Sequence, residues 1–247
     1  MGRLEQRVAL VTGASRGIGR ATATRFAAEG AKVALLSRTA ANLEGVVAEI
    51  KALGGKALAV PADIGCAEQI KAAVEKVVAA YGGLDILVNN AFDPSVAYAS
   101  ILALSAEQLQ RNFDVGPIAY LRFMQAAYPH LKASGQGRVI NFGSLAGVSG
   151  LVGMGPYAMA KEAVRALTRT AAREWAADNI TVNNVLPVAA TWGPEADVPP
   201  AANALGRYGS AEEDIAPVVL FLASKDAQFL TGYSLTPDGG AIIDSAR

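Results

Sequence analysis

The sequence predicts an α/β fold: one doubly wound, seven-stranded parallel sheet with helices on both of its faces. The first observation is a strict alternation of short aliphatic runs with longer amphipathic stretches, about one run in every 25–30 residues. The second is that these runs are almost wholly apolar, which is typical of parallel strands covered on both sides. No internal repeat or linker interrupts the alternation, so we expect residues 1–247 to form a single domain.

The boundaries of each element follow from its own pattern. Strands are expected near Val8–Val11, Lys32–Ser37, Ala57–Pro61, Ile86–Asn89, Arg138–Phe142, Thr181–Leu186 and Ser234–Thr236. Helices are expected near Gly17–Glu29, Ala40–Leu53, Ala67–Tyr81, Ala106–Lys132, Pro156–Ala177 and Ala211–Ala223.

Local signals support several helix ends. Ser105-x-x-Gln108 and Ser210-x-x-Glu213 are capping boxes, in which each side chain satisfies an otherwise unpaired amide. Gly54-Gly55 and Gly82-Gly83 are typical of left-handed C-caps. The one stretch without periodicity, residues 188–205, is rich in Pro and Ala, and we expect it to cross the carboxyl ends of the strands as a substrate lid.

Composition excludes several classes of function. The 22 basic and 22 acidic residues cancel, so nothing indicates nucleic acid or an anionic membrane surface as a partner. Cys66 is the one cysteine, which excludes an intramolecular disulfide and a multi-cysteine metal site. The chain starts with polar residues, and no apolar run approaches the roughly 20 residues of a spanning helix, so we expect a cytoplasmic protein without a metal.

A glycine-rich turn follows the first expected strand and opens the first helix. Gly13 permits the tight turn, Gly17 lets the backbone approach a pyrophosphate, and Gly19 allows close packing of helix on strand. The helix amino terminus then offers N–H groups and a positive dipole end to phosphates. The pattern predicts a Rossmann-type dinucleotide site.

The end of the second strand indicates which dinucleotide binds. An acidic residue there would bind the ribose 2′-hydroxyl of NAD. Here the chain has Ser37 and Arg38, and no carboxylate, while Arg16 in the glycine turn adds a second cation. A hydroxyl and two guanidinium groups suit a 2′-phosphate, so we expect NADP(H) as the cofactor.

A second constellation can move a proton beside such a cofactor. Tyr157 and Lys161 are spaced to share one face of a helix, and Ser144 precedes Tyr157 by thirteen residues. A phenol titrates near pH 10, and bringing it to about 7 needs roughly 4 kcal/mol of preference for the phenolate. A neighbouring ammonium and an oxidised nicotinamide can supply that energy, while Ser144 hydrogen-bonds the substrate oxygen.

These residues together resemble the short-chain dehydrogenase/reductase family over essentially the whole chain. The matching segments are Thr12-Gly-x-x-x-Gly-x-Gly19, Asp63, Asn89-Asn90-Ala91, Ser144, Tyr157-x-x-x-Lys161 and Asp238-Gly239-Gly240.

The resemblance implies Tyr157 as acid/base, Lys161 as the group that binds the nicotinamide ribose and lowers the tyrosine pKa, and Ser144 as the group that polarises the substrate. It also implies a homotetramer, or a homodimer, that pairs the two long helices. The cofactor-binding set that we expect is Gly13, Ser15, Arg16, Gly17, Ile18, Gly19, Ser37, Arg38, Asp63, Ile64, Asn89, Ala91, Tyr157, Lys161, Pro187 and Val188.

Three positions depart from the family pattern. Phe92 replaces the glycine of Asn-Asn-Ala-Gly, and Val188 replaces the glycine of Pro-Gly. The catalytic asparagine of the family aligns with Gly116, which precedes Pro117. We expect this Gly-Pro to break or kink the long helix and free a backbone carbonyl for the water that normally links asparagine to lysine, with Asn112 as the less favoured substitute.

The expected substrate lining is apolar and has no cationic cluster, which favours a hydrophobic ketone or secondary alcohol. It comprises Phe92, Leu145, Leu151, Val152, Met154, Val188 and Trp192. The single histidine, His130, is expected to act as a cation at a helix C-terminus rather than in catalysis.

Two other functions remain open. A 3-oxoacyl-carrier-protein reductase would need basic residues near the site mouth for its acidic carrier, for which Arg122, Lys132 and Arg207 are candidates. The departures from the family pattern allow a cofactor-binding scaffold or sensor with little catalysis, although the intact Ser144, Tyr157 and Lys161 argue against it.

Overall fold

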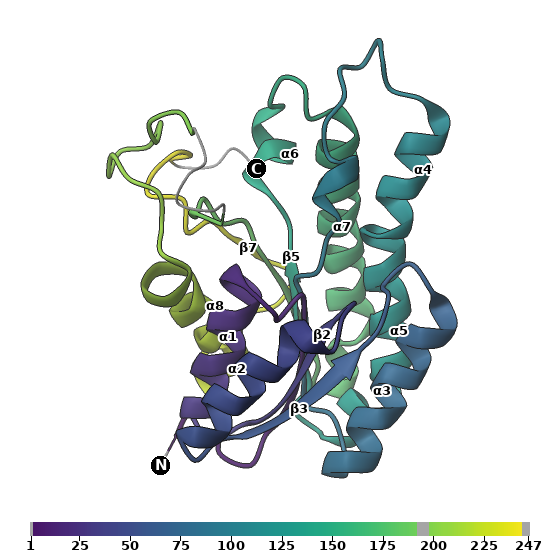
Figure 1. Cartoon of the computed structure of the whole chain (residues 1–247), viewed down its shortest axis with the longest axis vertical. Helices are drawn as coiled ribbons and strands as arrows, with labels where there is room; N and C mark the ends of the chain where they lie inside the picture. Colours follow the sequence, from purple (N-terminus) through teal and green to yellow (C-terminus); the bar gives the residue numbers. More distant parts are fainter. Residues whose placement is uncertain (1, 192–197, 244–247) are drawn as a thin grey trace.

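A seven-stranded, all-parallel sheet forms the centre of the molecule (Figure 1). The computed structural model describes residues 2–191 and 198–243. Its strands are β1 (Val8–Thr12), β2 (Lys32–Ser37), β3 (Lys56–Pro61), β4 (Ile86–Asn89), β5 (Arg138–Phe142), β6 (Thr181–Val185) and β7 (Ser234–Leu235). The expected strands are confirmed to within one or two residues at their ends.

The strand order is β3-β2-β1-β4-β5-β6-β7, so the chain reverses direction across the sheet between β1 and β4. Val11 of β1 pairs with Leu35 of β2 on one side and with Val88 of β4 on the other. Ligands of such sheets bind outside the carboxyl ends of the strands at this switch point. The fold therefore directs attention to the loops that follow β1, β2 and β4.

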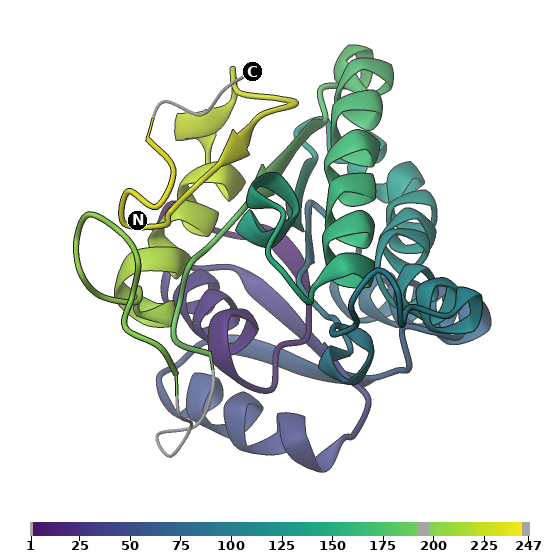
Figure 2. The same cartoon turned by 90° about the horizontal axis from the view of Figure 1, so that it is seen from above.

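Helices cover both faces of the sheet (Figure 2). On one face pack α1 (Gly17–Ala28), α2 (Ala41–Ala52), the π-helical turn η3 (Ala211–Ile215) and α8 (Ala216–Ala223). On the other pack α3 (Ala67–Tyr81), α4 (Ala106–Asp114), α5 (Pro117–Ala133) and α7 (Gly155–Glu174). Short pieces complete the chain: η1 (Pro94–Val96), α6 (Leu145–Ser149), η2 (Ala176–Asp178) and η4 (Lys225–Ala227). The doubly wound prediction is confirmed.

The long helix expected at Ala106–Lys132 is two helices, α4 and α5, separated by Val115 and Gly116. Gly116 has φ −115° and ψ −110°, outside the helical region. Pro117 then begins α5, where its missing N–H leaves no hydrogen bond unmade. The break that Gly-Pro predicts is confirmed.

The predicted caps are confirmed in part. Ser105 accepts a hydrogen bond from the amide of Gln108, and Ser210 accepts from the amides of Glu212 and Glu213. The Ser210 amide donates to the carboxylate of Asp214, however, and not to that of Glu213 as the capping box predicts. The reason is that η3 is wound as a π-turn, which brings the residue one position later into reach.

The segment expected to form a lid follows β6 over the carboxyl ends of the strands, and its described parts are residues 188–191 and 198–205. The amide of Ala190 donates to the carbonyl of Gly209, and the amide of Leu205 donates to the carbonyl of Gly239. Trp192, which we expected at the substrate, lies outside the described residues. No helix in the described part of the chain is long and apolar enough to cross a membrane.

Candidate active site

The glycine turn has the geometry that its sequence predicts. Gly13 (φ +67°) and Gly17 (φ +52°) both adopt the left-handed region that favours glycine. A Cβ added to Gly19 would lie 2.2 Å from the carbonyl oxygen of Gly13, so only glycine allows α1 to pack this closely on β1. A Cβ on Gly17 would meet only the Thr191 methyl group at 4.0 Å, which leaves the outer side of the turn open.

Polar side chains from β1 and β4 hold the turn in place. The Thr12 hydroxyl donates to the carbonyl of Val88 (3.2 Å) and accepts from the amide of Asn90 (2.9 Å). The Asn90 amide group donates to the carbonyls of Thr12 (2.9 Å) and Gly13 (3.3 Å). Asn90 thus positions the turn.

Asn89, the residue that we expected beside the cofactor, does not face the turn. Its side chain is fully buried and donates to the Asn141 side chain of β5 (2.9 Å). Side chains alternate along β4, so that of Asn89 faces β5 whereas that of Asn90 faces the glycine turn.

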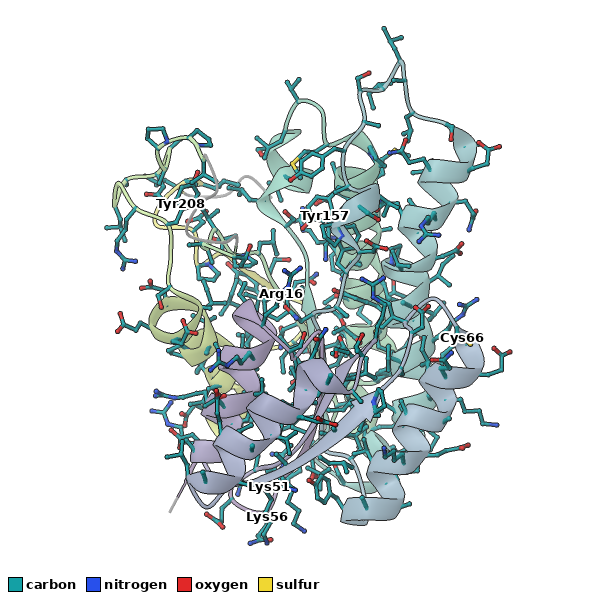
Figure 3. All side chains as sticks on the ribbon, viewed as in Figure 1. Arg16, Lys51, Lys56, Cys66, Tyr157 and Tyr208 are labelled. Atoms are coloured by element: carbon teal, nitrogen blue, oxygen red, sulfur yellow. The ribbon has the colours of Figure 1, made fainter. Side chains whose placement is uncertain are left out.

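A cleft of about 1090 Å³ runs from the glycine turn to the loops after β2, β3 and β4. The N-cap residue of α1, Arg16, makes no side-chain capping bond, so the first amides of α1 remain available to an anion. In Figure 3, Tyr157 lies in the upper half of the molecule and Arg16 near its middle, whereas Lys51 and Lys56 lie at its lower end. An open glycine turn, uncapped amides and a long cleft beside them fit a dinucleotide.

Most of the expected cofactor residues lie in this cleft, and several that we did not expect join them. The expected ones are Gly13, Ser15, Arg16, Gly17, Ile18, Ser37, Arg38, Asp63, Ile64 and Ala91, together with Phe92 from the expected substrate set. The additional ones include Thr39, Asn42, Asn90, Asp93, Tyr98 and Thr191. Gly19, Asn89, Tyr157, Lys161, Pro187 and Val188 are not part of its lining.

The adenosine end of the cleft contains a carboxylate that the sequence did not reveal. Asp93, in the loop after β4, faces Arg38 of the loop after β2 (Nη1–Oδ2 3.9 Å) and Arg111 of α4 (Nη2–Oδ2 3.6 Å). Partial burial raises the pKa of Asp93, but hydrogen bonds from Ser95 and the two guanidinium charges outweigh this and lower it. We expected no carboxylate at the end of β2, and the residues that directly follow β2 contain none. Asp93 belongs instead to the loop after β4, which lies two strands away in the sheet.

Three side chains meet at the carboxyl ends of β4 and β5. Ser144 follows β5 and caps α6, accepting from the amide of Ala146 (3.2 Å). Tyr157 lies in the first turn of α7, and Lys161 lies one turn further along the same face. The Ser144 hydroxyl group lies near enough to Tyr157 to lower the pKa of its phenol. The structure therefore brings the expected Ser, Tyr and Lys together.

Lys161 is buried in an aromatic pocket, with 3% of its surface exposed. Its Nζ donates to the carbonyl of Phe142 (2.7 Å) and lies 5.2, 5.3 and 5.6 Å from the ring centroids of Phe92, Tyr120 and Tyr157. Burial lowers the pKa of Lys161 to about 7. Near neutral pH this amine is therefore close to half-protonated.

The protein groups alone do not lower the pKa of Tyr157. Burial raises it, and the nearby Ser144 hydroxyl group opposes that rise. This differs from the expectation that Lys161 lowers it, because burial removes much of the lysine's own charge. The edge of the Phe92 ring also packs on the Tyr157 ring, with centroids 4.9 Å apart.

Both substitutes that we considered for the family's asparagine already make other hydrogen bonds. Asn112 is fully buried in α4, and its Nδ2 donates to the carbonyl of Val96, which ties α4 to η1. The carbonyl of Gly116 already accepts the first hydrogen bond of α5, from the amide of Tyr120 (3.0 Å). One lone pair of this carbonyl remains for a second donor, such as the water that we expected there.

The expected apolar residues on the segment between β5 and α7 differ in exposure. Leu151 and Val152 are exposed to 50% and 100%, whereas Leu145 and Met154 are partly buried. The loop at residues 97–104 pairs with this segment, since the amide of Ala99 donates to Gly153 and the amide of Gly155 donates to Ala99. Tyr98 from that loop lines the cleft and raises the pKa of Tyr157 as a minor cause.

No cluster of three or more His, Cys, Asp or Glu side chains that could hold a metal occurs among residues 2–191 and 198–243. The fold and cleft define a dinucleotide-binding protein with a Ser, Tyr and Lys cluster next to Phe92, which itself lines the cleft.

Comparison with known proteins is consistent with this geometry. Residues 7–192 match the family model described as short chain dehydrogenase. A 12alpha-hydroxysteroid dehydrogenase from a Clostridium species is 38% identical, covering 97% of this chain and 98% of the relative. A 3-oxoacyl-[acyl-carrier-protein] reductase from Thermotoga maritima is 36% identical over 98% of this chain and 100% of its own length.

A solved structure resembles the chain equally well. A short chain dehydrogenase from Burkholderia cenocepacia, crystallised in complex with NADP, superposes with a TM-score of 0.89 at 38% identity, covering 97% of this chain and 99% of the other. The chain belongs to the short-chain dehydrogenase/reductase family. It is an oxidoreductase of a family that uses a nicotinamide cofactor and acts on alcohols and ketones.

Proposed function

We propose that the protein is an NADP(H)-dependent oxidoreductase that interconverts a hydrophobic ketone and the corresponding secondary alcohol. The observation that carries this proposal is the buried cluster of Ser144, Tyr157 and Lys161 beside a cleft that fits a dinucleotide.

The preference for NADP(H) rests on charge at the adenosine end. Arg16, Ser37 and Arg38 all line the cleft. The Ser37 hydroxyl donates to the carbonyl of Thr39 (3.1 Å), which leaves its lone pairs free and its donor engaged. The guanidinium groups therefore supply the recognition of a 2′-phosphate, and the relative crystallised with NADP supports the proposal.

In the proposed mechanism the bound nicotinamide supplies or accepts the hydride. Ser144 hydrogen-bonds the substrate oxygen and holds the carbonyl carbon toward the cofactor. Tyr157 gives a proton to that oxygen during reduction and takes it during oxidation. Lys161 in its charged form stabilises the phenolate of Tyr157, and the positive charge of the oxidised cofactor adds to it, which offsets the effect of burial on the Tyr157 pKa.

The proposal of a hydrophobic substrate rests on the apolar side chains near Tyr157. Phe92 packs on the Tyr157 ring, and Leu151 and Met154 belong to the segment that precedes α7. We propose that the described residues 188–191 and 198–205 belong to a lid over this site. The relative that is a hydroxysteroid dehydrogenase is consistent with a bulky apolar substrate.

A 3-oxoacyl-carrier-protein reductase is the second candidate, favoured by the Thermotoga maritima relative. The basic residues that it needs are poorly placed. Lys132 pairs with Asp178 (2.8 Å) at the end of α5 that lies away from the site, and Arg207 pairs with Asp214 (2.6 Å). Arg122 lies in the groove between α3 and α5. The first proposal therefore stands ahead of this one.

The assembly is proposed to be a homotetramer or homodimer through α5 and α7. Leu121 of α5 and Met159 of α7 expose 39% and 45% of their surface, which is apolar area that a second subunit could cover. Sedimentation velocity of the wild type tests this, and a monomer at micromolar concentration would contradict it.

The first experiment is calorimetric titration of the purified protein with NADPH and NADH, followed by turnover of hydrophobic ketones with the tighter cofactor. The proposal expects tighter NADPH binding and turnover. Tight binding without turnover of any ketone, or of the matching alcohols with oxidised cofactor, would favour a cofactor-binding scaffold. Turnover of acyl-carrier-protein thioesters alone would favour the second candidate.

A further inference from the structure

We propose that Tyr120 is a positioning residue for Lys161, and that its hydroxyl group accepts the hydrogen bond that the family's asparagine-linked water would accept. This inference rests on the proposed function, because it concerns the lysine of the same site. Tyr120 lies on α5, one helical turn after Gly116, the position that lacks the asparagine.

Lys161 and Tyr120 are in direct contact, and both are buried. The Nζ of Lys161 donates to the hydroxyl oxygen of Tyr120 at 3.4 Å, and the two residues expose 3% and 1% of their surface. The amide of Tyr120 donates to the carbonyl of Gly116 (3.0 Å), so the first hydrogen bond after the helix break holds the backbone of Tyr120 in position. The helix break therefore helps to place the Tyr120 side chain against Lys161.

Within the described residues, Lys161 is the hydrogen-bond partner of the Tyr120 hydroxyl group, and Tyr157 is near enough to raise the pKa of this phenol. Burying a hydroxyl group without a partner costs free energy, and phenylalanine would fill the same volume without that cost. A tyrosine at this position is therefore best explained by its contact with the lysine.

The surroundings leave Lys161 with few other acceptors. Phe142 offers its carbonyl, and the rings of Phe92 and Tyr157 pack around the amine. The titratable groups that face it are the phenols of Tyr157 and Tyr120 alone, since no carboxylate of the described residues forms an ion pair with it. Each acceptor removed disfavours the charged form of the amine, and a less charged lysine stabilises the Tyr157 phenolate less.

The test is the pH profile of alcohol oxidation by the Tyr120→Phe variant. Oxidation needs Tyr157 as a base, so its rate rises with pH through the apparent pKa of Tyr157 in the complex with the oxidised cofactor. Loss of the hydroxyl acceptor is expected to move this rising limb up by about one pH unit, which corresponds to about 1.4 kcal/mol. Affinity for the cofactor and the unfolding midpoint should change little.

The matched control is Tyr128→Phe on the same helix. The Tyr128 hydroxyl also donates a hydrogen bond, to Asp178, but it lies two turns further along α5 and away from the site. Its profile should match the wild type. A Tyr120→Phe limb that stays in place, or that moves only as far as the control, would overturn the proposal.

A second measurement tests the inference without turnover. In protein labelled with ¹³C at lysine Cε, the Lys161 resonance is identified by its loss in Lys161→Arg and is titrated by NMR. Tyr120→Phe should lower its midpoint relative to the wild type, and an unchanged midpoint would refute the role of Tyr120. An inactive wild type with a shifted Lys161 midpoint would instead reject the proposed function and retain the contact.

Discussion

Asp93 is expected to reduce the affinity for NADP(H), because its carboxylate competes with the 2′-phosphate for Arg38. The informative variant is Asp93→Asn. The Oδ1 atom of Asp93 accepts from the Ser95 amide (3.0 Å) and hydroxyl (2.7 Å), and asparagine retains an oxygen there, so η1 keeps its cap. The substitution removes only the negative charge that faces Arg38 and Arg111.

The magnitude follows from the distance between Arg38 and Asp93. Two unit charges 3.9 Å apart interact by about 1 kcal/mol in water and about 4 kcal/mol at an effective dielectric constant of 20. Because the Arg38 side chain is 68% exposed, the value for a solvated pair applies, which is about 0.5–1 kcal/mol. Releasing Arg38 should therefore tighten NADPH binding by roughly two- to fivefold.

The assay is calorimetric titration of wild type and variant with NADPH and with NADH at low and at high salt. The ratio of the two dissociation constants should move toward NADPH by that factor, and 0.5 M salt should reduce the effect. Asp114→Asn on α4 is the matched control, since it removes the same charge from a side chain that bonds Gln110 instead. An equal change for both cofactors, or a change shared with the control, would refute the competition.

Three further outcomes are expected. Gly116→Ala should destabilise the protein by about 1–3 kcal/mol in urea unfolding, because its Cβ would lie 2.8 Å from the carbonyl oxygen of Asn112, and an unchanged midpoint would contradict the packing. The pKa of Lys161 is about 7 in the folded protein against an ordinary value of 10.5, so between these values the unfolded chain binds one more proton than the folded protein. From pH 7 to 9 the unfolding free energy of the wild type should therefore rise, relative to that of Lys161→Met, by up to about 1.4 kcal/mol per pH unit. Parallel plots of unfolding free energy against pH for the two proteins would contradict the burial of the lysine. Ser144→Ala should lower turnover by about 10²–10³-fold with NADPH affinity retained, and turnover within twofold of the wild type would remove Ser144 from the mechanism.

The fold could be predicted from the sequence because its signals are local. Apolar runs such as Val8–Val11 predict both a strand and its burial. Gly116-Pro117 predicts the helix break because proline restricts the backbone of the residue before it and has no N–H of its own. The short helix α6 escaped prediction, since five residues give no periodicity and its start depends on the Ser144 cap. The π-turn before α8 escaped for the same reason.

The site could be predicted only where neighbours in sequence are neighbours in space. Tyr157 and Lys161 share a helix, and their spacing was sufficient. Contacts between distant segments were not visible: Asp93 reaches Arg38 from another loop, and Tyr120 reaches Lys161 across two helices, a separation of 41 residues. The effect of burial on the Lys161 amine, which changes what it can do for Tyr157, likewise depends on packing that no motif records.

Restoring asparagine at Gly116 is not a neutral probe in this structure. The Cβ of any side chain there would crowd the Asn112 carbonyl, and Pro117 prevents the local backbone from becoming helical. Removing the Tyr120 hydroxyl examines the same part of the site without that strain.

The most direct test of the central claim is Tyr157→Phe, measured for NADPH binding and for ketone turnover in the same preparation. The account predicts an unchanged NADPH dissociation constant with turnover reduced at least about 10²-fold, because the variant keeps the ring against Phe92 and loses only the proton donor. Turnover equal to that of the wild type would contradict the assignment of Tyr157 as acid/base and, with it, the proposed mechanism.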